Sequence, residues 1–328
     1  MILAGDIGGT NTRLALVRRD ASAELQIVKD GKFPSTAYDG LHAIVGQFLT
    51  EHDAKPESAC FGVAGPVQNG RCETMNLTWV VDQLELAEAM GVARVSVIND
   101  LAANAYGISC LAANDLDTIN VGAPNASGHA VVVSPGTGLG EAGMFWDGKQ
   151  YHPIPTEGGH TDFAPRNKLE LELAAFLMEE HEHVSYERIV SGPGLVNIYR
   201  FLRDTGRGEE PAWLAQEMAN KDPGAVISNA ALTNRSALCE QALDMFIELF
   251  GAEAGNMMLS YMATGGVWLG GGIVVKILSR IKARKHFMSG FTSKGRLTEV
   301  MRDVPIRAIL NDQTALLGAA KHAFDLLA

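Results

Sequence analysis

Cysteine and long apolar runs are both scarce in this sequence. Four cysteines occur in 328 residues, and none has a Cys-x-x-Cys spacing, so neither a disulfide framework nor a zinc site is indicated. No stretch approaches 18 uninterrupted apolar residues, and no basic segment precedes an apolar one at the N-terminus. We therefore expect a cytoplasmic protein with reduced thiols.

An excess of basic residues is also missing. The net charge is −11 at pH 7, which argues against nucleic acid and anionic membranes as partners. A local basic cluster occurs at Lys282, Arg284 and Lys285. We interpret this cluster as the solvated face of a helix rather than a binding site.

Two familiar phosphate-binding motifs are absent. The pattern Gly-x-x-x-x-Gly-Lys-Ser/Thr does not occur, and the first Gly-rich stretch does not have the spacing Gly-x-Gly-x-x-Gly. A P-loop protein and a dinucleotide-binding Rossmann protein are therefore not indicated.

The residues that are present favour a globular protein of two lobes. Hydrophobic residues make up 47% of the chain and charged residues 20%, which is enough apolar material for a substantial core. A chain of 328 residues exceeds the usual domain size of about 100 to 200 residues. We expect two lobes with a cleft between them.

The N-terminus predicts a hairpin with a Gly-rich tip. Ile2–Ala4 and Leu14–Val17 have the length and composition of buried strands. Between them, Gly8 and Gly9 permit a positive φ and let backbone N–H groups face an anion such as phosphate. Asp6, at the end of the first strand, is placed to hold Mg²⁺ or its waters. The alternative is an ordinary Gly-rich hairpin without a ligand.

The remaining chain alternates strand and helix patterns. Further strands are expected at Leu25–Phe33, Ala59–Val63, Arg94–Ile98, Val267–Leu269 and Val304–Leu310. Helices are expected at Tyr38–His52, Asp82–Met90, Leu101–Leu111, Lys168–Glu182, Leu195–Arg203 and Thr314–Leu327. Trp213–Met262 has a helical pattern that is broken near Lys221–Pro223 and Thr233, and Tyr151–Pro165 is expected to be a loop.

A second Gly-rich hairpin repeats the layout of the first. Ala130–Val133 leads into Ser134–Gly140, and an outgoing strand is expected at Glu141–Phe145. This is the nearest feature to an internal repeat. It predicts two phosphate hairpins, one in each lobe.

Asn99 and Asp100 follow a predicted strand. Ligands in α/β proteins bind at the carboxyl ends of strands, so this position favours a catalytic or binding role. Asp100 offers a carboxylate that can act as a general base. Alternatively, Asp100 is only the N-cap of the helix that follows.

These motifs together resemble a known enzyme family. Asp6–Asn11 resembles the first phosphate loop of the sugar kinase, actin and Hsp70-type ATPase superfamily, and the later motifs resemble the bacterial glucokinases outside the ROK group. The resemblance implies an α/β, two-lobed, actin-like ATPase (ribonuclease H-like) fold. It also implies a small domain of residues 1–111 completed by 303–328, and a large domain of residues 112–302.

The resemblance also implies the residues of the site. The residues implied to bind ATP are Gly5, Asp6, Ile7, Gly8, Gly9, Thr10, Asn11, Gly136, Thr137, Gly138, Gly270, Gly271 and Gly272. The residues implied to hydrogen-bond the sugar are Asn76, Asn99, Asp100, Glu157, His160 and Glu187. Asp100 is implied to take the proton of the 6-hydroxyl, and Asp6 to hold Mg²⁺ through water. The Cys-rich zinc motif of ROK kinases is missing after His160, so no structural zinc is expected.

The function implied is that of a hexose kinase that uses Mg·ATP, most simply a glucokinase that forms glucose 6-phosphate. A kinase for fructose, mannose or an N-acetylhexosamine is one alternative. A sugar-sensing regulator on the same fold is another, and an added DNA-binding segment would favour it. A chaperone-like ATPase would lack the sugar-binding residues. Relatives are commonly dimers, so we expect a homodimer.

Overall fold

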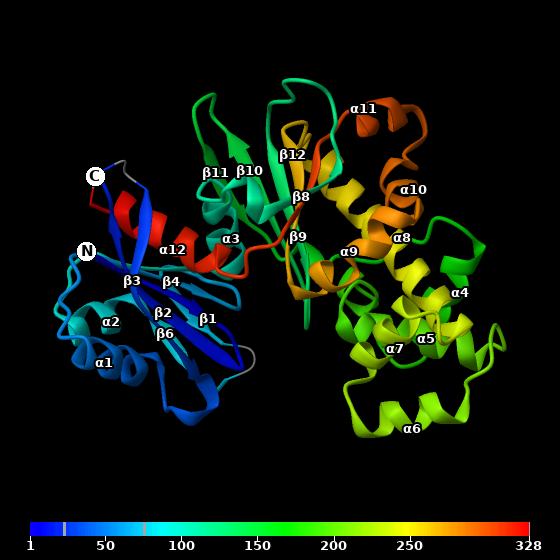
Figure 1. The fold of residues 1–328 in the computed structure, drawn as a ribbon, viewed down its shortest axis with the longest axis horizontal. Coiled ribbons are helices and arrows are strands. Elements are labelled where there is room, and N and C mark those ends of the chain that lie inside the picture. Colours follow the sequence, from blue (N-terminus) through cyan, green and yellow to red (C-terminus); the bar gives the residue numbers. More distant parts are fainter. Residues whose placement is uncertain (22–23, 75–76, 328) are drawn as a thin grey trace. The chain divides into compact units, whose positions relative to one another are not determined.

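A mixed β-sheet lies at the centre of each of the two units into which the chain divides. The computed structural model describes residues 1–21, 24–74 and 77–327. The first unit consists of Met1–Asp115, Lys149–Pro155 and Asn311–Ala328, and the second of Leu116–Gly148 and Thr156–Leu310 (Figure 1).

The first unit is built on a sheet with the strand order β3-β2-β1-β4-β7. Its strands are β1 (Ile2–Ile7), β2 (Asn11–Arg19), β3 (Leu25–Pro34), β4 (Ala59–Val63) and β7 (Val95–Asn99). β1, β4 and β7 are parallel, whereas β2 is antiparallel to both β1 and β3. A small antiparallel pair, β5 (Arg71–Glu73) and β6 (Val80–Asp82), lies outside this sheet.

Alternating side chains of this sheet belong to two separate cores, as the two-residue period of a strand requires. Leu3 of β1 is buried with residues of α1 (Leu41–Glu51) and α2 (Gln83–Met90). Ile2 and Ala4 are buried instead with residues of α12 (Thr314–Asp325). α3 (Asp100–Ile108) also packs against α12.

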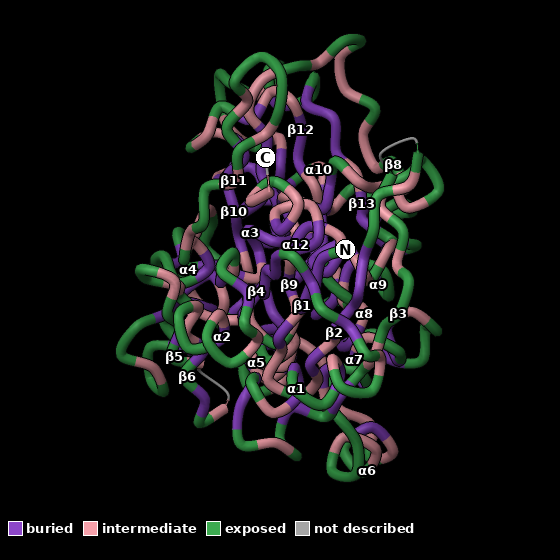
Figure 2. The backbone as a smooth tube through the Cα atoms, turned by 90° about the vertical axis from the view of Figure 1, so that its left-hand side faces the viewer, coloured by how far each residue is buried: buried purple, intermediate pink, exposed green. Residues whose placement is uncertain are grey.

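The second unit contains the strand order β10-β9-β12-β13-β8. These strands are β8 (Leu116–Asn120), β9 (Ala130–Pro135), β10 (Leu139–Trp146), β12 (Gly266–Leu269) and β13 (Ile306–Ile309). β9, β12 and β13 are parallel, whereas β10 is antiparallel to β9 and β8 is antiparallel to β13. The central strands β1 and β9 of the two sheets are almost wholly buried (Figure 2).

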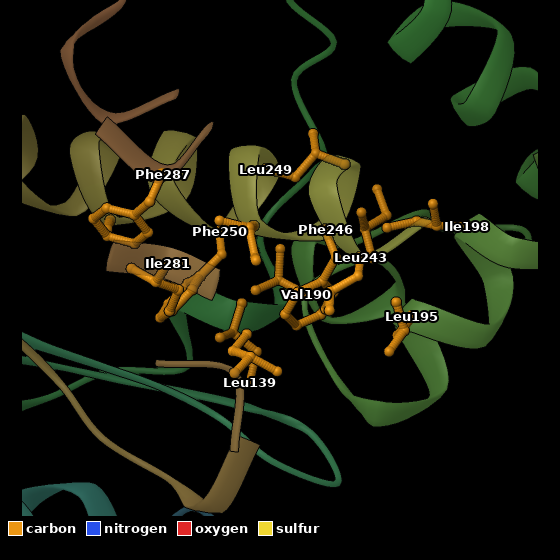
Figure 3. Packing of buried hydrophobic residues seen from close by; sticks show 14 of the residues in the cluster. Leu139, Val190, Leu195, Ile198, Leu243, Phe246, Leu249, Phe250, Ile281 and Phe287 are labelled. Atoms are coloured by element: carbon orange, nitrogen blue, oxygen red, sulfur yellow. The ribbon is translucent and has the colours of Figure 1, made fainter. Parts of the chain in front are cut away.

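The helices of the second unit gather around α8 (Ala237–Tyr261), which contacts α5, α7 and α10. The other helices are α4 (Lys168–Met178), α5 (Gly192–Asp204), α6 (Ala212–Asn220), α7 (Pro223–Leu232), α9 (Gly272–Ala283), α10 (His286–Thr292) and α11 (Thr298–Arg302). Phe246 and Phe250 of α8 are fully buried, and Phe287 packs edge-on against Phe250 (Figure 3). None of the helices in the described part of the chain combines the length and apolar character needed to span a bilayer.

Most of the predicted elements are confirmed, and a few predictions are wrong. The breaks at Lys221–Pro223 and Thr233 separate α6, α7 and α8, and Asp82 and Gly91 cap α2 as expected. The predicted loop Tyr151–Pro165 is wrong at its start, because Tyr151–Pro155 forms strand β11. β8 was not predicted. β13 pairs with β12 and β8 and therefore belongs to the sheet of the second unit. Of the C-terminal segment 303–328, only residues 311–328 belong to the first unit.

α3 and α12 approach each other through glycines. A Cβ added to Gly318 would lie 1.7 Å from the carbonyl oxygen of Ala103, and one added to Gly107 would lie 2.0 Å from that of Thr314. Both distances are far shorter than any real contact of a methyl group with a carbonyl oxygen. The two helices, which lie side by side in Figure 1, therefore require glycine at these positions.

We expect Gly318→Ala to destabilise the first unit by about 1 to 3 kcal/mol or more, because the new methyl group overpacks the helix crossing. Gly46→Ala is the matched control, since Gly46 is an exposed residue of α1 whose added Cβ would meet nothing within 4 Å. The control should be neutral or stabilising by about 0.5 to 1 kcal/mol. Thermal unfolding of the two variants tests this, and equal melting temperatures would contradict it.

Candidate active site

The first Gly-rich turn closes the hairpin of β1 and β2. The backbone N–H of Gly8 donates to the carbonyl of Asn11 at 3.0 Å, and Ser35 Oγ donates to the carbonyl of Gly8 at 2.8 Å. The backbone N–H of Ser35, at the start of the 3-10 helix η1 (Ser35–Ala37), donates to the carbonyl of Thr10 at 3.0 Å. Ser35 thus holds the turn in place, while Thr10 within the turn is exposed to solvent. A turn of this kind can present its N–H groups to an anion.

Asp6 lies on β1 just before this turn. Burial raises the pKa of its carboxyl, Arg13 on β2 opposes the rise, and Asp312 adds to it. Arg13 is itself paired with Asp312, at 2.8 Å between Nη2 and Oδ2. A nearby divalent cation would restore the charged form of Asp6, and carboxylate oxygens are ligands that Mg²⁺ prefers. The residues present at this turn therefore fit a magnesium ion.

Three parallel strands of the first unit end at one edge of its sheet. Ile7 of β1, Val63 of β4 and Asn99 of β7 are aligned in register. Asp100 follows Asn99, and its Cα lies only 3.7 Å from the position that a Cβ on Gly62 would take. The structure thus brings Asn99 and Asp100 to the carboxyl edge of the sheet at which the first turn also lies.

Asn99, rather than Asp100, is the N-cap of α3. Asn99 Oδ1 accepts hydrogen bonds from the N–H groups of Leu101 at 2.9 Å and Ala102 at 3.2 Å. Asn99 Nδ2 donates to the carbonyl of Gly65 at 3.2 Å. Asp100 is instead the first residue of the helix, and its Oδ1 lies 2.9 Å from the N–H of Leu101. The positive end of the helix dipole favours an ionised carboxylate at this position.

The second Gly-rich turn lies between β9 and β10, and two later segments are bonded to it. The N–H of Gly136 donates to the carbonyl of Gly138 at 2.8 Å, and the carbonyl of Gly136 accepts the N–H of Gly192 at 2.8 Å. Glu187 Oε2 accepts the N–H of Leu139 at 3.0 Å. Glu187, on the 3-10 helix η4 (Tyr186–Arg188), therefore lies against the turn itself.

Glu157 and His160 are carried by a short segment that also packs on this turn. Glu157 directly precedes the 3-10 helix η3 (Gly158–His160), and His160 is its last residue. Both are exposed. Gly159 is buried, and a Cβ added to it would lie 2.1 Å from the carbonyl oxygen of Leu139. η3 also contacts η4, which carries Glu187. The three residues implied to bind sugar hydroxyls in this unit are thus brought together.

The third Gly-rich run lies next to the same turn. The N–H of Gly270 donates to the carbonyl of Val133 at 3.0 Å. Gly271 has φ of 88°, and a Cβ on it would lie 2.5 Å from the carbonyl oxygen of Pro135. Gly272 begins α9, and a Cβ there would meet nothing within 4 Å. An open helix N-terminus beside a Gly-rich turn suits an anionic ligand such as a nucleotide phosphate.

The structure leaves one predicted residue out and adds an unpredicted pair. Asn76 lies outside the described residues. Glu141 on β10 and Glu253 on α8 are buried acids close to η3 that no predicted motif includes. The only sequence signal was that Glu141, a charged residue, directly follows a Gly-rich run. This pattern does not indicate whether the residue is buried.

Comparisons with known proteins agree on one family. A family model described as Glucokinase matches residues 3–325. A glucokinase of Nostoc sp. (strain PCC 7120) is 42% identical over 335 residues, which cover 98% of this chain and 98% of that one. A glucokinase of Synechocystis sp. (strain PCC 6803) is 36% identical and covers 97% of this chain and 96% of that one.

Solved structures agree with this result. The crystal structure of glucokinase from an Antarctic psychrotroph has a TM-score of 0.84 and 33% identity, and the match covers 99% of this chain and 98% of that one. A ROK family glucokinase from Streptomyces griseus, solved with glucose and AMPPNP, has a TM-score of 0.66 at 19% identity, covers 99% of each chain and shows the fold alone. The expected α/β, actin-like ATPase fold is thereby confirmed.

We expect Asn99→Ala to lower the stability of the first unit by about 0.5 to 2 kcal/mol, because α3 loses its N-cap. Asn99→Asp keeps the capping oxygen and loses only the donor to the Gly65 carbonyl, so its loss should be smaller. Melting temperatures of the two variants measure the difference. A larger loss for Asn99→Asp than for Asn99→Ala would disprove the capping role.

Proposed function

Because the chain belongs to the glucokinase family, we propose that Asp100 is the base of a glucose-phosphorylating reaction. ATP-dependent phosphorylation of glucose is the activity of this chain, and the match over nearly its whole length carries that conclusion. In the proposed step the Asp100 carboxylate accepts the 6-hydroxyl proton while the hydroxyl oxygen attacks the γ-phosphorus of ATP, and the bond from that phosphorus to the β,γ-bridging oxygen breaks to release ADP. The place of Asp100 in the first turn of α3 supports this role, since the N-terminal end of a helix favours a negatively charged group.

Glucose is proposed to be held by Asn76, Asn99, Asp100, Glu157, His160 and Glu187. Carboxylates, amides and an imidazole together supply the acceptors and donors that sugar hydroxyls need. Glu187 has one oxygen bonded to Leu139 N–H, which fixes the orientation of the carboxylate. The amide of Asn99 has two N–H donors, of which the Gly65 carbonyl takes one.

ATP is proposed to bind the three Gly-rich segments. Gly5–Asn11 and Gly136–Gly138 would take the phosphates, and Gly270–Gly272 would take the adenosine. Asp6 would hold Mg²⁺ through water, and the ion would neutralise charge on the transferred phosphoryl group. The open space at Gly136 and Gly272 supports this proposal, because a ligand can approach the backbone closely there.

The expected homodimer, the cytoplasmic location and the lack of nucleic-acid or membrane partners are also proposals. The net charge of −11 supports the last of these. Symmetric dimers are the commonest oligomers of proteins in solution, which favours a homodimer.

A coupled assay with Mg·ATP against a panel of hexoses tests the activity. Glucose should have the highest kcat/KM, because a site built to bond hydroxyls leaves groups unpaired when a different sugar binds. Equal turnover of glucose and fructose would leave a kinase but remove the preference for glucose.

Asp100→Asn should bind glucose normally but lose about 10²-fold or more in kcat, because the amide cannot accept the hydroxyl proton. Since Asn99 already caps α3, the melting temperature should change little. Turnover close to that of wild type would remove Asp100 from the mechanism. Calorimetric titration with glucose checks that binding is retained.

Gly136→Val should raise the KM for ATP about tenfold or more without lowering the melting temperature of the free protein, because the side chain has room until phosphate binds. Gly138 is a poorer choice for this test, since a Cβ there would lie 2.4 Å from Glu187 Oε2 and would also disturb the glucose residues. The KM for glucose serves as the internal control. An unchanged ATP KM would show that this turn does not hold phosphate.

A further inference from the structure

Glu141 is a buried acid on β10, and no ion pair within the described part of the chain includes it. Its side chain is 1% exposed, and neither carboxyl oxygen meets a hydrogen-bond donor among the described residues. An isolated ionised carboxylate in a protein interior is strongly unfavourable. Glu141 must therefore be neutralised in some other way.

The group that faces Glu141 is a second buried acid, Glu253 of α8, which is 3% exposed. Burial, together with the charge of Glu253, raises the pKa of Glu141 to about 9. Burial also raises the pKa of Glu253, but Asn256 and Lys294 favour its charged form, and Asn256 Nδ2 donates to Glu253 Oε2 at 2.8 Å. These neighbours therefore favour the neutral form of Glu141 and the charged form of Glu253.

A proton, rather than a metal ion, neutralises Glu141 in this pair. A pocket of about 480 Å³ is lined by both acids and by Asp162. Each oxygen of Glu141 nevertheless exposes less than 1 Å², so an ion in the pocket would not reach it. The pocket is therefore not a candidate cation site.

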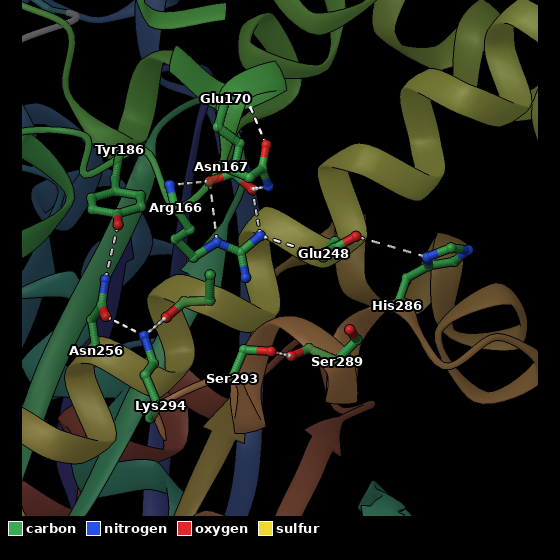
Figure 4. A network of polar contacts seen from close by, with 11 residues as sticks. Arg166, Asn167, Glu170, Tyr186, Glu248, Asn256, His286, Ser289, Ser293 and Lys294 are labelled. Atoms are coloured by element: carbon green, nitrogen blue, oxygen red, sulfur yellow. Dashed lines mark hydrogen bonds and ion pairs between the residues drawn. The ribbon is translucent and has the colours of Figure 1, made fainter. Parts of the chain in front are cut away.

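The other titratable groups near the pair form a bonded network on its α8 side. Asn256 links the hydroxyl of Tyr186, at 2.9 Å, to the ammonium of Lys294 (Figure 4). Burial raises the pKa of Tyr186 to about 12 and also raises that of Tyr261, whereas it lowers that of Lys294. The two tyrosines thus stay neutral where Glu141 titrates.

Glu141 also supports the segment that carries Glu157 and His160. Its carbonyl accepts the hydroxyl of Thr156 at 3.1 Å, and Thr156 Oγ1 accepts the N–H of Gly158 at 3.0 Å. Its carboxyl lies against Gly158, where an added Cβ would be 2.2 Å from Glu141 Oε2. Both the backbone and the side chain of Glu141 therefore contact the start of η3.

We propose that Glu141 is a positioning residue for glucose binding, which holds the Glu157–His160 segment through a neutral carboxyl bonded to Glu253. This inference rests on the proposed function, because it takes Glu157 and His160 to bind glucose. An ionised Glu141 would repel Glu253, and the separation of the two carboxylates would displace Gly158 with them.

Steady-state kinetics of Glu141→Ala and Glu141→Gln test the proposal. Glu141→Ala removes the support below Gly158, so the KM for glucose should rise about tenfold with a smaller change in kcat. Glu141→Gln has the size of the protonated acid and still donates to Glu253, so its KM should stay close to that of wild type. A folded Glu141→Ala enzyme with the wild-type KM would overturn the proposal.

The pH profile gives a second measurement, which also serves if Glu141→Ala does not fold. The wild-type KM for glucose should rise as the pH increases through about 9, where the Glu141–Glu253 pair loses its proton. The Gln variant should lack this rise, while titration of Lys294 and the tyrosines remains common to both proteins. Identical profiles would contradict a role for the Glu141 proton.

Two controls separate this inference from the proposed function. Glu170→Gln changes a buried acid of α4 that is bonded to Arg166 and Asn167, so it should lower the melting temperature without changing the KM for glucose. His160→Ala should raise that KM. If His160→Ala has no effect, the proposed glucose site is wrong; if it has an effect and Glu141→Ala does not, only the positioning role is wrong.

Discussion

Close approach of backbone to backbone around the second Gly-rich turn is the constraint on which the site of the second unit depends. Gly159 lies against the carbonyl of Leu139, and Gly271 against that of Pro135, at distances that leave no room for a Cβ. Backbone N–H groups of Leu139 and Gly192 complete the assembly through bonds to Glu187 and Gly136. The segments implied to bind sugar and nucleotide therefore share one support, and a side chain introduced at either glycine would force them apart.

The strands and helices that carry the strongest local patterns could be predicted from the sequence. The capping of α2 by Asp82 and Gly91 depends on local hydrogen bonds and a left-handed residue, so neighbouring residues were sufficient to identify it. β8 was missed because Leu116–Asn120 is short and only partly buried. β11 was missed because it contains prolines at 153 and 155, which are found in strands mainly at sheet edges.

The order of the site motifs along the chain could also be predicted, but not their supports. The Asp6–Asn11 motif and the later Gly-rich runs have local sequence patterns, and the family they indicated is confirmed. Ser35 holds the first turn from 27 residues beyond Gly8, and no local pattern marks it. The partner of Glu141 lies on α8, so the burial of the two acids depends on tertiary packing that the sequence near Glu141 does not reveal.

Asp6 and Glu141 are acids that burial affects in the same direction, yet their surroundings assign them different chemistry. Asp6 has a guanidinium nearby and lies beside an exposed turn, where the proposed magnesium ion would favour its charged form. Glu141 faces a second acid, and its oxygens are out of reach of solvent, so a proton is the neutralising group that the packing allows. Burial raises the pKa of both acids, but access from solution and the charge of the nearest neighbour decide whether each is suited to bind a metal ion or to support a backbone segment.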